Sequence, residues 1–491
     1  MLSACGGGGS DGAPAGTSTS AQLAQQCAPS NDLAPGAHTG SLDIERRWVR
    51  AYVDEAYLWY DEVPNVNTAD PRYNTAYAPY SLNEYFRALR VATKDHFSFA
   101  YPTALWQQLA GSGIQAGYGI EWITGSATPP RDIRIAYVQP GSPGAAAGLR
   151  RGDRLVTADG ASADASATDP ADGTRLRAMY PGAAGESHSF VFSRDGASTL
   201  STPLTAANVT MTPVPLASVI TAADGTQVGY LLFHDHVAPA EAQLIAAIEQ
   251  LRAANVTDLV LDIRYNGGGY LYIASVLAYM IAGPTHTSGR VFERYSYNDK
   301  RVADNNAASS RLGFVNTSCI LDANYRCTRQ NPLPTLGLSR VHVITRAGTC
   351  SASEAIINGL RGVDVDVRQI GSTTCGKPYG FSAKDNCGIS YFPIEFKGVN
   401  DKGFGDYASG FTPAGSGATG VPGCVVADDF SKALGDPTEG MLAAALAYRL
   451  NGSCPAAPLG TDRSQALRAT AGGGFMQRGP LRENRLLLPP R

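Results

Sequence analysis

Three short segments of the chain carry residue types suited to nucleophilic catalysis. In the first, Ser351 lies in the run Gly-Thr-Cys-Ser-Ala-Ser-Glu, between an apolar strand-like stretch that ends at Thr345 and an apolar helical stretch at 355–360. A serine at the start of a helix lies beside amides that have no acceptor within the helix, and these favour developing negative charge. An ordinary serine N-cap has the same local sequence, so this segment alone leaves both interpretations open.

The second segment contains Lys377, in the run Gly-Ser-Thr-Thr-Cys-Gly-Lys-Pro that follows a predicted strand at 363–370. Its neighbours include Cys375, Tyr379 and Phe381, and desolvation among such side chains favours the neutral amine over the ammonium. A neutral lysine can accept the proton of a serine hydroxyl, the role that histidine fills in other serine enzymes. The plainer alternative is a surface lysine beside a turn.

The third segment places Gly267, Gly268 and Gly269 directly after a buried strand-like run at 259–263. Glycines at such a point leave the backbone amides uncovered, as a site that stabilises an oxyanion requires. A flexible turn is the alternative for this segment taken alone.

The order of these segments resembles that of the C-terminal processing peptidases, also called tail-specific proteases. The chain has an Asp-x-Arg-x-Asn-x-Gly-Gly run at 262–269, a Ser-Ala-Ser-Glu run at 351–354 and a Gly-Lys pair 26 residues after Ser351. The run Lys-Asp-His-Phe-Ser at 94–98 is similar to the family's Asp-Pro-His-Ser stretch. The resemblance covers about residues 45–450.

This resemblance implies a serine endopeptidase with a Ser–Lys dyad and no cofactor or metal. Ser351 corresponds to the nucleophile and Lys377 to the general base, and the amides of Ala352 and Gly268 correspond to the oxyanion donors. The fold implied for the core is the α/β type of Clp-like proteases and crotonases.

The chain departs from the family pattern at two places. Phe381 stands where many members have a glutamine that orients the lysine, so Glu354 and Asp364 both remain candidates for a third member of the site. Cys350 and Cys375 flank the two catalytic segments, which suggests an active site braced by disulfides.

The segments before the catalytic core predict an anchor and a helical domain. Residues 1–40 are rich in small residues and predict a disordered tether, and Cys5 lies in a lipobox-like Leu-Ser-Ala-Cys run, so we expect lipidation there. Residues 41–112 predict a helical domain, because Trp48 and Tyr52 begin an apolar face at helical spacing. Within it, the Ser-Leu-Asn-Glu run that starts at Ser81 predicts a capping box.

Residues 113–206 predict a β-rich, PDZ-like domain. A Gly-Leu-Arg-Arg-Gly-Asp run at 148–153 resembles the turn of bacterial PDZ domains, which bind an extended peptide beside an open strand. Gly117, Tyr118, Gly119 and Ile120 are the candidate loop for the peptide carboxylate. A β-rich spacer without a ligand is the alternative.

Alternating apolar strands and helices predict an α/β catalytic core at 207–455, which makes the whole chain a multidomain α/β protein. Asp436 predicts the N-cap of its last helix, and residues 456–491 read as a loose tail.

Composition and charge exclude several classes of partner. The 491 residues carry 40 basic and 43 acidic side chains, a net charge of −3 that offers no footprint for nucleic acid. No apolar run of about 18 residues predicts a membrane-spanning helix. We expect polypeptide partners with accessible C-termini and a location in the bacterial cell envelope, periplasmic or lipid-anchored to the outer membrane through Cys5. The sequence defines no oligomeric state.

Apart from Cys5 the chain has eight cysteines, an even number that fits disulfides in an oxidising compartment. No Cys-x-x-Cys run suggests a metal site. Local pairing is the simplest expectation, with Cys27 and Cys350 not needing partners. It joins Cys319 to Cys327, Cys375 to Cys387, and Cys424 to Cys454.

Three other interpretations remain open. A histidine-based site would use His234 or His236, which flank Asp235 near a strand end. A PDZ-bearing binding protein would keep the fold without strong activity. A crotonase-like acyl-CoA enzyme is disfavoured, because the PDZ-like segment would have no role in it.

Overall fold

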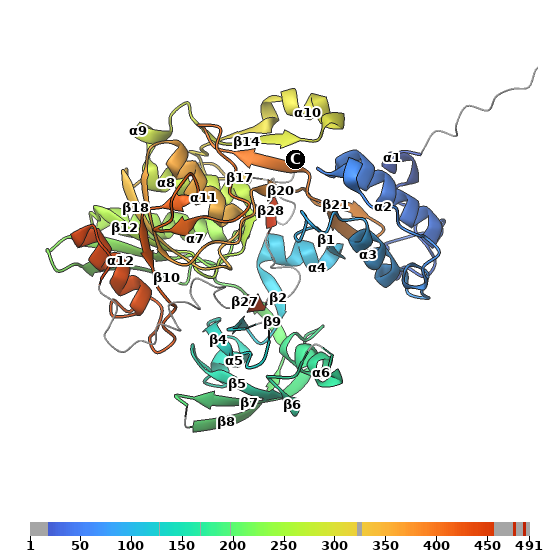
Figure 1. The fold of residues 1–491 in the computed structure, drawn as a ribbon, viewed down its shortest axis with the longest axis horizontal. Helices are drawn as coiled ribbons and strands as arrows, with labels where there is room; N and C mark the ends of the chain where they lie inside the picture. The colour runs from blue at the N-terminus through green and yellow to red at the C-terminus, as the bar shows by residue number, and fades with distance from the viewer. Residues whose placement is uncertain are drawn as a thin grey trace, which may run out of the picture.

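The computed structural model of the protein describes residues 18–126, 128–166, 168–196, 198–321, 327–455, 475–477 and 485–487. Cys5 and most of the predicted tether lie outside these residues. A helical N-terminal part, a β-rich part and a larger α/β core follow one another along the chain (Figure 1). Within the described ranges, no helix combines the length and apolar character needed to cross a membrane.

The N-terminal part packs on the core through helices and one strand. Its helices are α1 (Ser20–Leu23), α2 (Leu42–Ala56), α3 (Ala78–Ala88) and α4 (Thr103–Gln107), with 3₁₀ turns at Tyr60–Glu62 and Pro71–Tyr73 and a π-helical turn at Gln108–Ser112. Strand β1 (Phe99–Pro102) pairs with β22 (Ile389–Phe392) of the core. Trp48 lies against Tyr391, with ring centroids 5.2 Å apart. The predicted capping box is wrong: α3 begins at Ala78, and the Ser81 hydroxyl accepts a hydrogen bond from the Thr75 amide.

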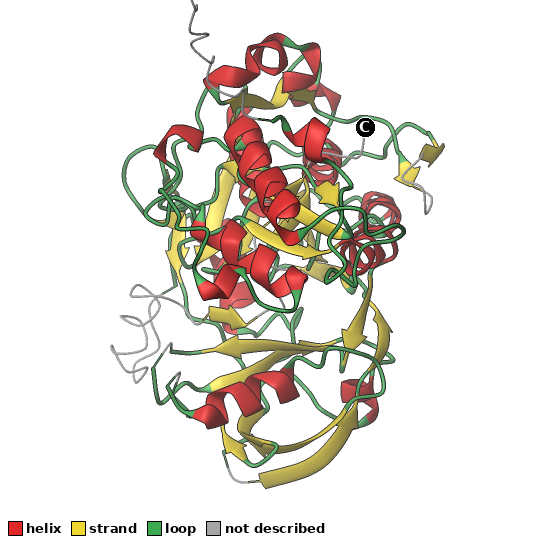
Figure 2. Ribbon diagram, turned by 90° about the vertical axis from the view of Figure 1, so that its right-hand side faces the viewer, coloured by secondary structure: helices red, strands yellow, loops and turns green. Residues whose placement is uncertain are grey.

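The β-rich part has its own apolar core, which includes Trp122, Phe190 and Phe192. Its sheet has the order β27-β3-β4-β5-β7-β8, with β6 paired to β5, and its long strands lie below the α/β core in Figure 2. The elements are β3 (Ile120–Thr124), β4 (Ile133–Val138), β5 (Arg154–Ala158), β6 (Ala161–Ser162), β7 (Ser187–Arg194), β8 (Ser198–Thr205), α5 (Pro143–Ala146) and α6 (Pro170–Met179). Strands β2 (Ile114–Gly117) and β9 (Ala207–Thr210) pair where the chain enters and leaves this part.

The core is built on a six-stranded sheet of order β10-β11-β12-β18-β19-β26. All neighbours except β10 and β11 run parallel. The strands are β10 (Leu216–Thr221), β11 (Gln227–Leu232), β12 (Asp258–Asp262), β18 (Arg340–Thr345), β19 (Asp366–Gly371) and β26 (Gly423–Val425). The carboxyl ends of β12, β18 and β19 therefore meet at one edge, where parallel α/β sheets place their sites.

Successive apolar side chains of the strands point to opposite faces of this sheet, and helices cover both faces. Leu259, Leu261 and Val343 face the side of α7 (Ala240–Ala253), α8 (Leu271–Ala282) and α11 (Ala352–Gly362). Val260 and Ile344 face α12 (Gly440–Asn451). The predicted N-cap at Asp436 is wrong: Glu439 caps α12 and accepts a hydrogen bond from the Leu442 amide.

Smaller sheets complete the core. One has the order β15-β14-β23-β20, another has the order β1-β22-β21, and short pairs join β16 to β17 and β24 to β25. The elements not yet bounded are α9 (Pro284–Thr287), α10 (Val302–Asn306), β14 (Val291–Tyr297), β15 (Arg311–Gly313), β16 (Ile320–Leu321), β17 (Cys327–Arg329), β20 (Tyr379–Gly380), β21 (Lys384–Asn386), β23 (Phe396–Val399), β24 (Thr412–Pro413), β25 (Gly420–Val421), and 3₁₀ turns at Asp299–Arg301 and Ala308–Ser310.

The tail contributes two strands to the fold, although the sequence predicts a loose segment. Strand β27 (Phe475–Gln477) pairs with β3, and β28 (Arg485–Leu487) pairs with β13 (Gly268–Tyr270) of the glycine-rich turn.

Four disulfides join the described cysteines, and they correct one predicted pair. Cys319–Cys327 and Cys424–Cys454 are confirmed. The predicted pair Cys375–Cys387 is wrong, and Cys27 and Cys350 both have partners. The other two disulfides are Cys27–Cys387 and Cys350–Cys375. Pairing by nearness in the sequence fails here for two reasons. Strands β18 and β19 are adjacent and parallel, so the loops that follow them meet and bring Cys350 to Cys375. The β1–β22 pairing brings the N-terminal part, with Cys27, beside Cys387.

Candidate active site

Ser351 lies in the loop between β18 and α11, in an unusual backbone conformation. It precedes the first residue of α11 with φ 61° and ψ −114°, whereas an ordinary N-cap is extended. Its side chain has no exposed surface, and its Oγ makes no hydrogen bond to any described residue. Ser351 and Glu354 nevertheless hold the N-cap and N3 positions of a capping box at the start of α11, so the N-cap interpretation stays open beside that of a nucleophile. A non-glycine residue held in this region of φ and ψ is typical of functional sites.

Lys377 lies in the loop after β19, at the next strand end along the same edge of the sheet. It is fully buried. Its Nζ lies 4.2 Å from the ring centroid of Phe381 and 5.0 Å from that of Phe97. Phe381, which stands where many family members have a glutamine, thus packs beside the amine. Phe97, from the run at 94–98 in the N-terminal part, also lies beside it.

A disulfide joins the two loops. Cys350 precedes Ser351 directly, Cys375 lies two residues before Lys377, and their Cα atoms are 5.2 Å apart. The Cys375 amide also donates a hydrogen bond to the Thr349 carbonyl, at 3.0 Å. The Glu354 carboxylate lies close to both sulfurs, but the disulfide removes both thiolates as metal ligands.

Glu354 connects the same two loops through its carboxylate. One oxygen accepts hydrogen bonds from the amides of Ser351 (3.0 Å) and Lys377 (2.8 Å), and the other accepts from the Gly376 amide (2.8 Å) and the Thr374 hydroxyl (2.5 Å). Burial raises the pKa of Glu354 above its ordinary value, against the opposing effect of these hydrogen bonds. Of the two acids that the sequence leaves open, the structure brings only this one to the site. Asp364 is exposed and pairs with Lys402.

The glycine-rich turn lies next to the Ser351 loop and is held by Asn266. The Asn266 carbonyl accepts hydrogen bonds from the Cys350 amide (3.1 Å) and the Ser353 hydroxyl (3.0 Å). Its side-chain Oδ1 accepts from the Gly268 amide at 3.0 Å, so this predicted oxyanion donor is engaged within the turn. Ala352, the other predicted donor, is the first residue of α11, and its amide has no acceptor within the helix.

The histidines lie near this turn but do not contact the nucleophile by a hydrogen bond. His236 Nδ1 lies 2.9 Å from Asn266 Oδ1, and burial lowers the pKa of His236 to about 4. His234 stacks on Tyr137 of the β-rich part, with ring centroids 3.9 Å apart. Ser351 Oγ has no hydrogen-bond partner among the described residues, so neither histidine is bonded to it, and neither is Lys377.

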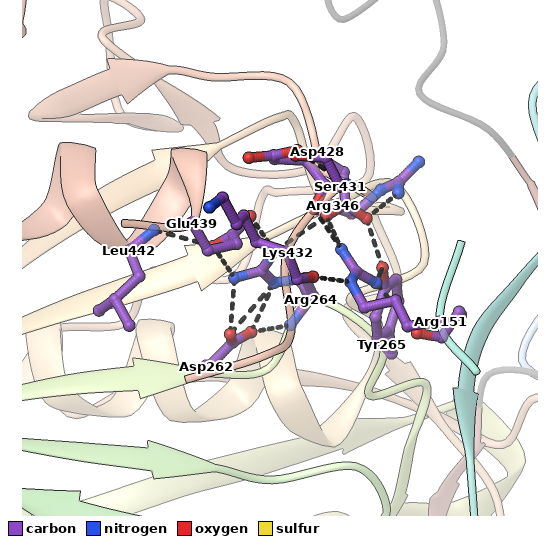
Figure 3. Close-up of polar contacts among 12 residues, drawn as sticks. Arg151, Asp262, Arg264, Tyr265, Arg346, Asp428, Ser431, Lys432, Glu439 and Leu442 are labelled. Carbon is purple, nitrogen blue, oxygen red and sulfur yellow. Dashed lines mark hydrogen bonds and ion pairs between the residues drawn. The ribbon is translucent and has the colours of Figure 1, made fainter. Parts of the chain in front are cut away.

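A buried ion network joins the PDZ-like part to the base of the site (Figure 3). Asp428 pairs with Arg151 of the PDZ-like turn, with Arg264 and with Arg346. Arg264 also forms paired contacts with Asp262 and Glu439.

The charges of this network are matched although they are buried. Burial raises the pKa of Asp428, but its three arginine partners together hold that pKa far below the usual range. Arg264 precedes Asn266 by two residues, and Arg346 precedes Ser351 by five. The network therefore supports the bases of the glycine-rich turn and of the loop that carries Ser351. The sequence alone identified Asp262 and Arg264 only as parts of a motif.

The candidate carboxylate loop lines a cavity of about 490 Å³ between the β-rich part and the N-terminal part, which contributes Tyr101, Leu105 and Gln108. Gly117, Tyr118, Gly119 and Ile120 all contribute to its wall. The carbonyls of Tyr118 and Gly119 accept hydrogen bonds from Gly144 and Gln139, which shapes the loop. Within the described part of the chain, the amides of Tyr118 and Gly119 donate to no backbone carbonyl, so they remain available to an anion.

Comparison with protein families gives a consistent assignment. Residues 227–383 match the model for Peptidase family S41, residues 45–99 match the Peptidase S41 N-terminal domain, and residues 134–172 match the PDZ domain. A chloroplastic C-terminal processing peptidase from Tetradesmus obliquus is 29% identical over 336 residues, which are 65% of this chain. The chain spans 64% of the length of that relative.

One solved structure supports the fold. The crystal structure of a Bacteroides fragilis protein assigned to the S41 proteases matches with a TM-score of 0.59 and 22% identity, covering 82% of this chain and 97% of that one. A photosystem II D1 C-terminal processing protease matches with a TM-score of 0.43 and 21% identity, covering 76% and 92%. The predicted fold class is confirmed: a helical N-terminal region, a PDZ domain and an α/β catalytic domain.

Proposed function

We propose that the chain is a serine endopeptidase with Ser351 as nucleophile and Lys377 as general base, because residues 227–383 match the model for Peptidase family S41. The observation that carries the proposal is the way the two residues are held. Both are fully buried at adjacent strand ends, and both the Cys350–Cys375 disulfide and the carboxylate of Glu354 join their loops.

The chemistry follows from this placement. Ser351 Oγ attacks the peptide carbonyl carbon while its proton passes to the neutral Lys377 amine, and the resulting ammonium then protonates the leaving amine. Water hydrolyses the acyl-enzyme by the same route. The Ala352 amide stabilises the oxyanion at the N-terminus of α11. The Gly268 amide can do so only after turning away from Asn266.

The dyad is tested by cleavage of an unfolded protein substrate. We expect Ser351→Ala and Lys377→Ala each to reduce kcat by more than about 10³-fold, and the double variant to be no worse than either, since the two residues act as a unit. The exposed Lys384→Ala serves as the matched control and should keep full activity. Substantial activity in Lys377→Ala, together with its loss in a His236 variant, would refute the assignment. A wild-type protein that binds unfolded chains without cutting them would favour the binding-protein alternative.

We also propose that the PDZ domain selects substrates by their C-terminal carboxylate. The cavity and the amides of Tyr118 and Gly119 support this, because PDZ domains bind a chain end beside an open strand. Peptides with a free, apolar C-terminus should be cut at least fivefold faster than the same peptides with an amidated end. Equal rates would show that the domain does not recognise the terminus.

The location we propose is the bacterial cell envelope. The support is chemical: four disulfides join the described cysteines, and such bonds persist in oxidising compartments. Lipid attachment at Cys5 remains a proposal from the sequence. Mass spectrometry of non-reduced peptides from the native host would find the four bonds, and finding all eight thiols free would contradict the location.

A further inference from the structure

The two tail strands pair with two main-chain edges, that of β3 in the PDZ-like part and that of β13 in the glycine-rich turn. Strand β27 pairs antiparallel with β3, with Phe475 opposite Thr124 and Gln477 opposite Trp122. Strand β28 pairs parallel with β13, with Arg485 opposite Gly268 and Leu487 opposite Tyr270. Figure 1 shows β27 beside the β-rich part and β28 within the core.

The first contact has the direction of a bound chain end. Without β27, strand β3 would be the edge of its sheet, with a row of main-chain groups open to pairing. Because the pairing is antiparallel, the tail advances from Thr124 towards Ile120, and so towards the candidate carboxylate loop. A peptide that adds to this edge with its C-terminus at the loop would run the same way.

The second contact lies at the catalytic loops. The Gly268 carbonyl and the Tyr270 amide both form hydrogen bonds with the backbone of His236. Backbone groups of successive strand residues point to opposite sides, so those of Gly269 face the other edge of β13, where β28 pairs. β28 also comes within 8 Å, Cα to Cα, of β20, which starts two residues after Lys377. The tail backbone thus lies close to both the glycine-rich turn and the strand that follows the lysine.

The two tail strands are close together in the sequence. Eight residue steps separate Gln477 from Arg485, and an extended chain of that length spans up to about 28 Å. A segment attached to the same chain competes at a high effective concentration, in the millimolar range for flexible tethers.

We propose that strands β27 and β28 are a built-in competitor that occupies the edges of β3 and β13 in cis. This inference rests on the proposed function, since it assumes that substrates use the same two edges. Substrates must displace the tail before they reach Ser351. The tail raises the apparent KM and leaves the chemical step unchanged.

The test uses the full chain with prolines at tail positions whose amides face the partner strands, Gln477→Pro together with Leu487→Pro, so that each proline removes a ladder hydrogen bond. Gln465→Pro, between α12 and β27, is the matched control. We expect the double variant to show a KM for an unfolded protein substrate at least fivefold lower than wild type, with kcat unchanged. The control should match wild type, and a synthetic peptide of residues 475–487 should inhibit the double variant competitively. Equal KM values for all three proteins would overturn the proposal.

A binding measurement separates this proposal from the proposed function. In a Ser351→Ala background, fluorescence anisotropy follows binding of the labelled 475–487 peptide without any need for cleavage. The peptide should bind the double proline variant at least fivefold more tightly than the chain with an unmodified tail. Equal affinities would overturn the competitor role. If the proline variant binds the peptide more tightly but the wild-type enzyme cleaves no substrate, the competitor role stands and the protease assignment is refuted.

Discussion

Removal of the Cys350–Cys375 disulfide should reduce activity far more than its effect on stability explains. The bond closes a loop with a sequence separation of 25 residues, which predicts a loss of about 3.5 kcal/mol in the free energy of unfolding. It also joins the segments that carry Ser351 and Lys377. A displacement of about 1 Å between reacting groups can cost on the order of 10²-fold in rate, so we expect the double serine variant to lose that much kcat/KM.

The chain offers a matched control in Cys424–Cys454. That bond has a sequence separation of 30 residues, which predicts nearly the same stability loss, and it ties β26, at the edge of the main sheet, to the segment after α12. Urea unfolding and peptide cleavage at 25 °C, on variants shown to be folded by circular dichroism, separate the two effects. The control pair should lose stability and keep its activity within about twofold. Similar losses of activity in both pairs, or full activity without Cys350–Cys375, would refute the reasoning.

Three further predictions concern buried carboxyl groups. Glu354→Gln gives the Ser351 and Lys377 amides a poorer acceptor. A hydrogen bond to a charged group contributes about 1.5–3 kcal/mol, so weakening these bonds should lower kcat by at least about tenfold. An unchanged kcat would show that Glu354 positions neither loop. Burial raises the pKa of Glu293 to about 8, so the folded state binds this proton more tightly and stability falls as pH rises from about 4.5 to 8. By pH 7 the loss is about 3 kcal/mol, and Glu293→Gln should abolish this part of the urea-measured pH dependence. Asp428→Asn leaves three buried arginines without their shared partner and should destabilise the protein by about 3–5 kcal/mol; an unaltered unfolding midpoint would contradict the role of the network.

Local sequence signals predicted elements well where the apolar pattern was strong. The buried run at 259–263 became β12 (Asp258–Asp262), and the helical run before the tail became α12. Capping signals failed at Ser81, because α3 already begins at Ala78 and the Ser81 hydroxyl bonds to the nearby Thr75, and they failed at Asp436. At α12 the cap is Glu439, which Arg264 holds in place from another segment.

The sequence by itself determined the kinds of residue available for catalysis and their order, since Ser351, Lys377 and the glycine-rich turn lie in short motifs that need no partner to be identified. Tertiary structure alone decided how they meet. The pairing of β18 with β19 sets Cys350 beside Cys375, and burial with its amide donors selects Glu354 over the exposed Asp364. Likewise, no local pattern marks the tail as a partner of β3 and β13, because strand pairing depends on which main-chain edges the completed fold leaves open.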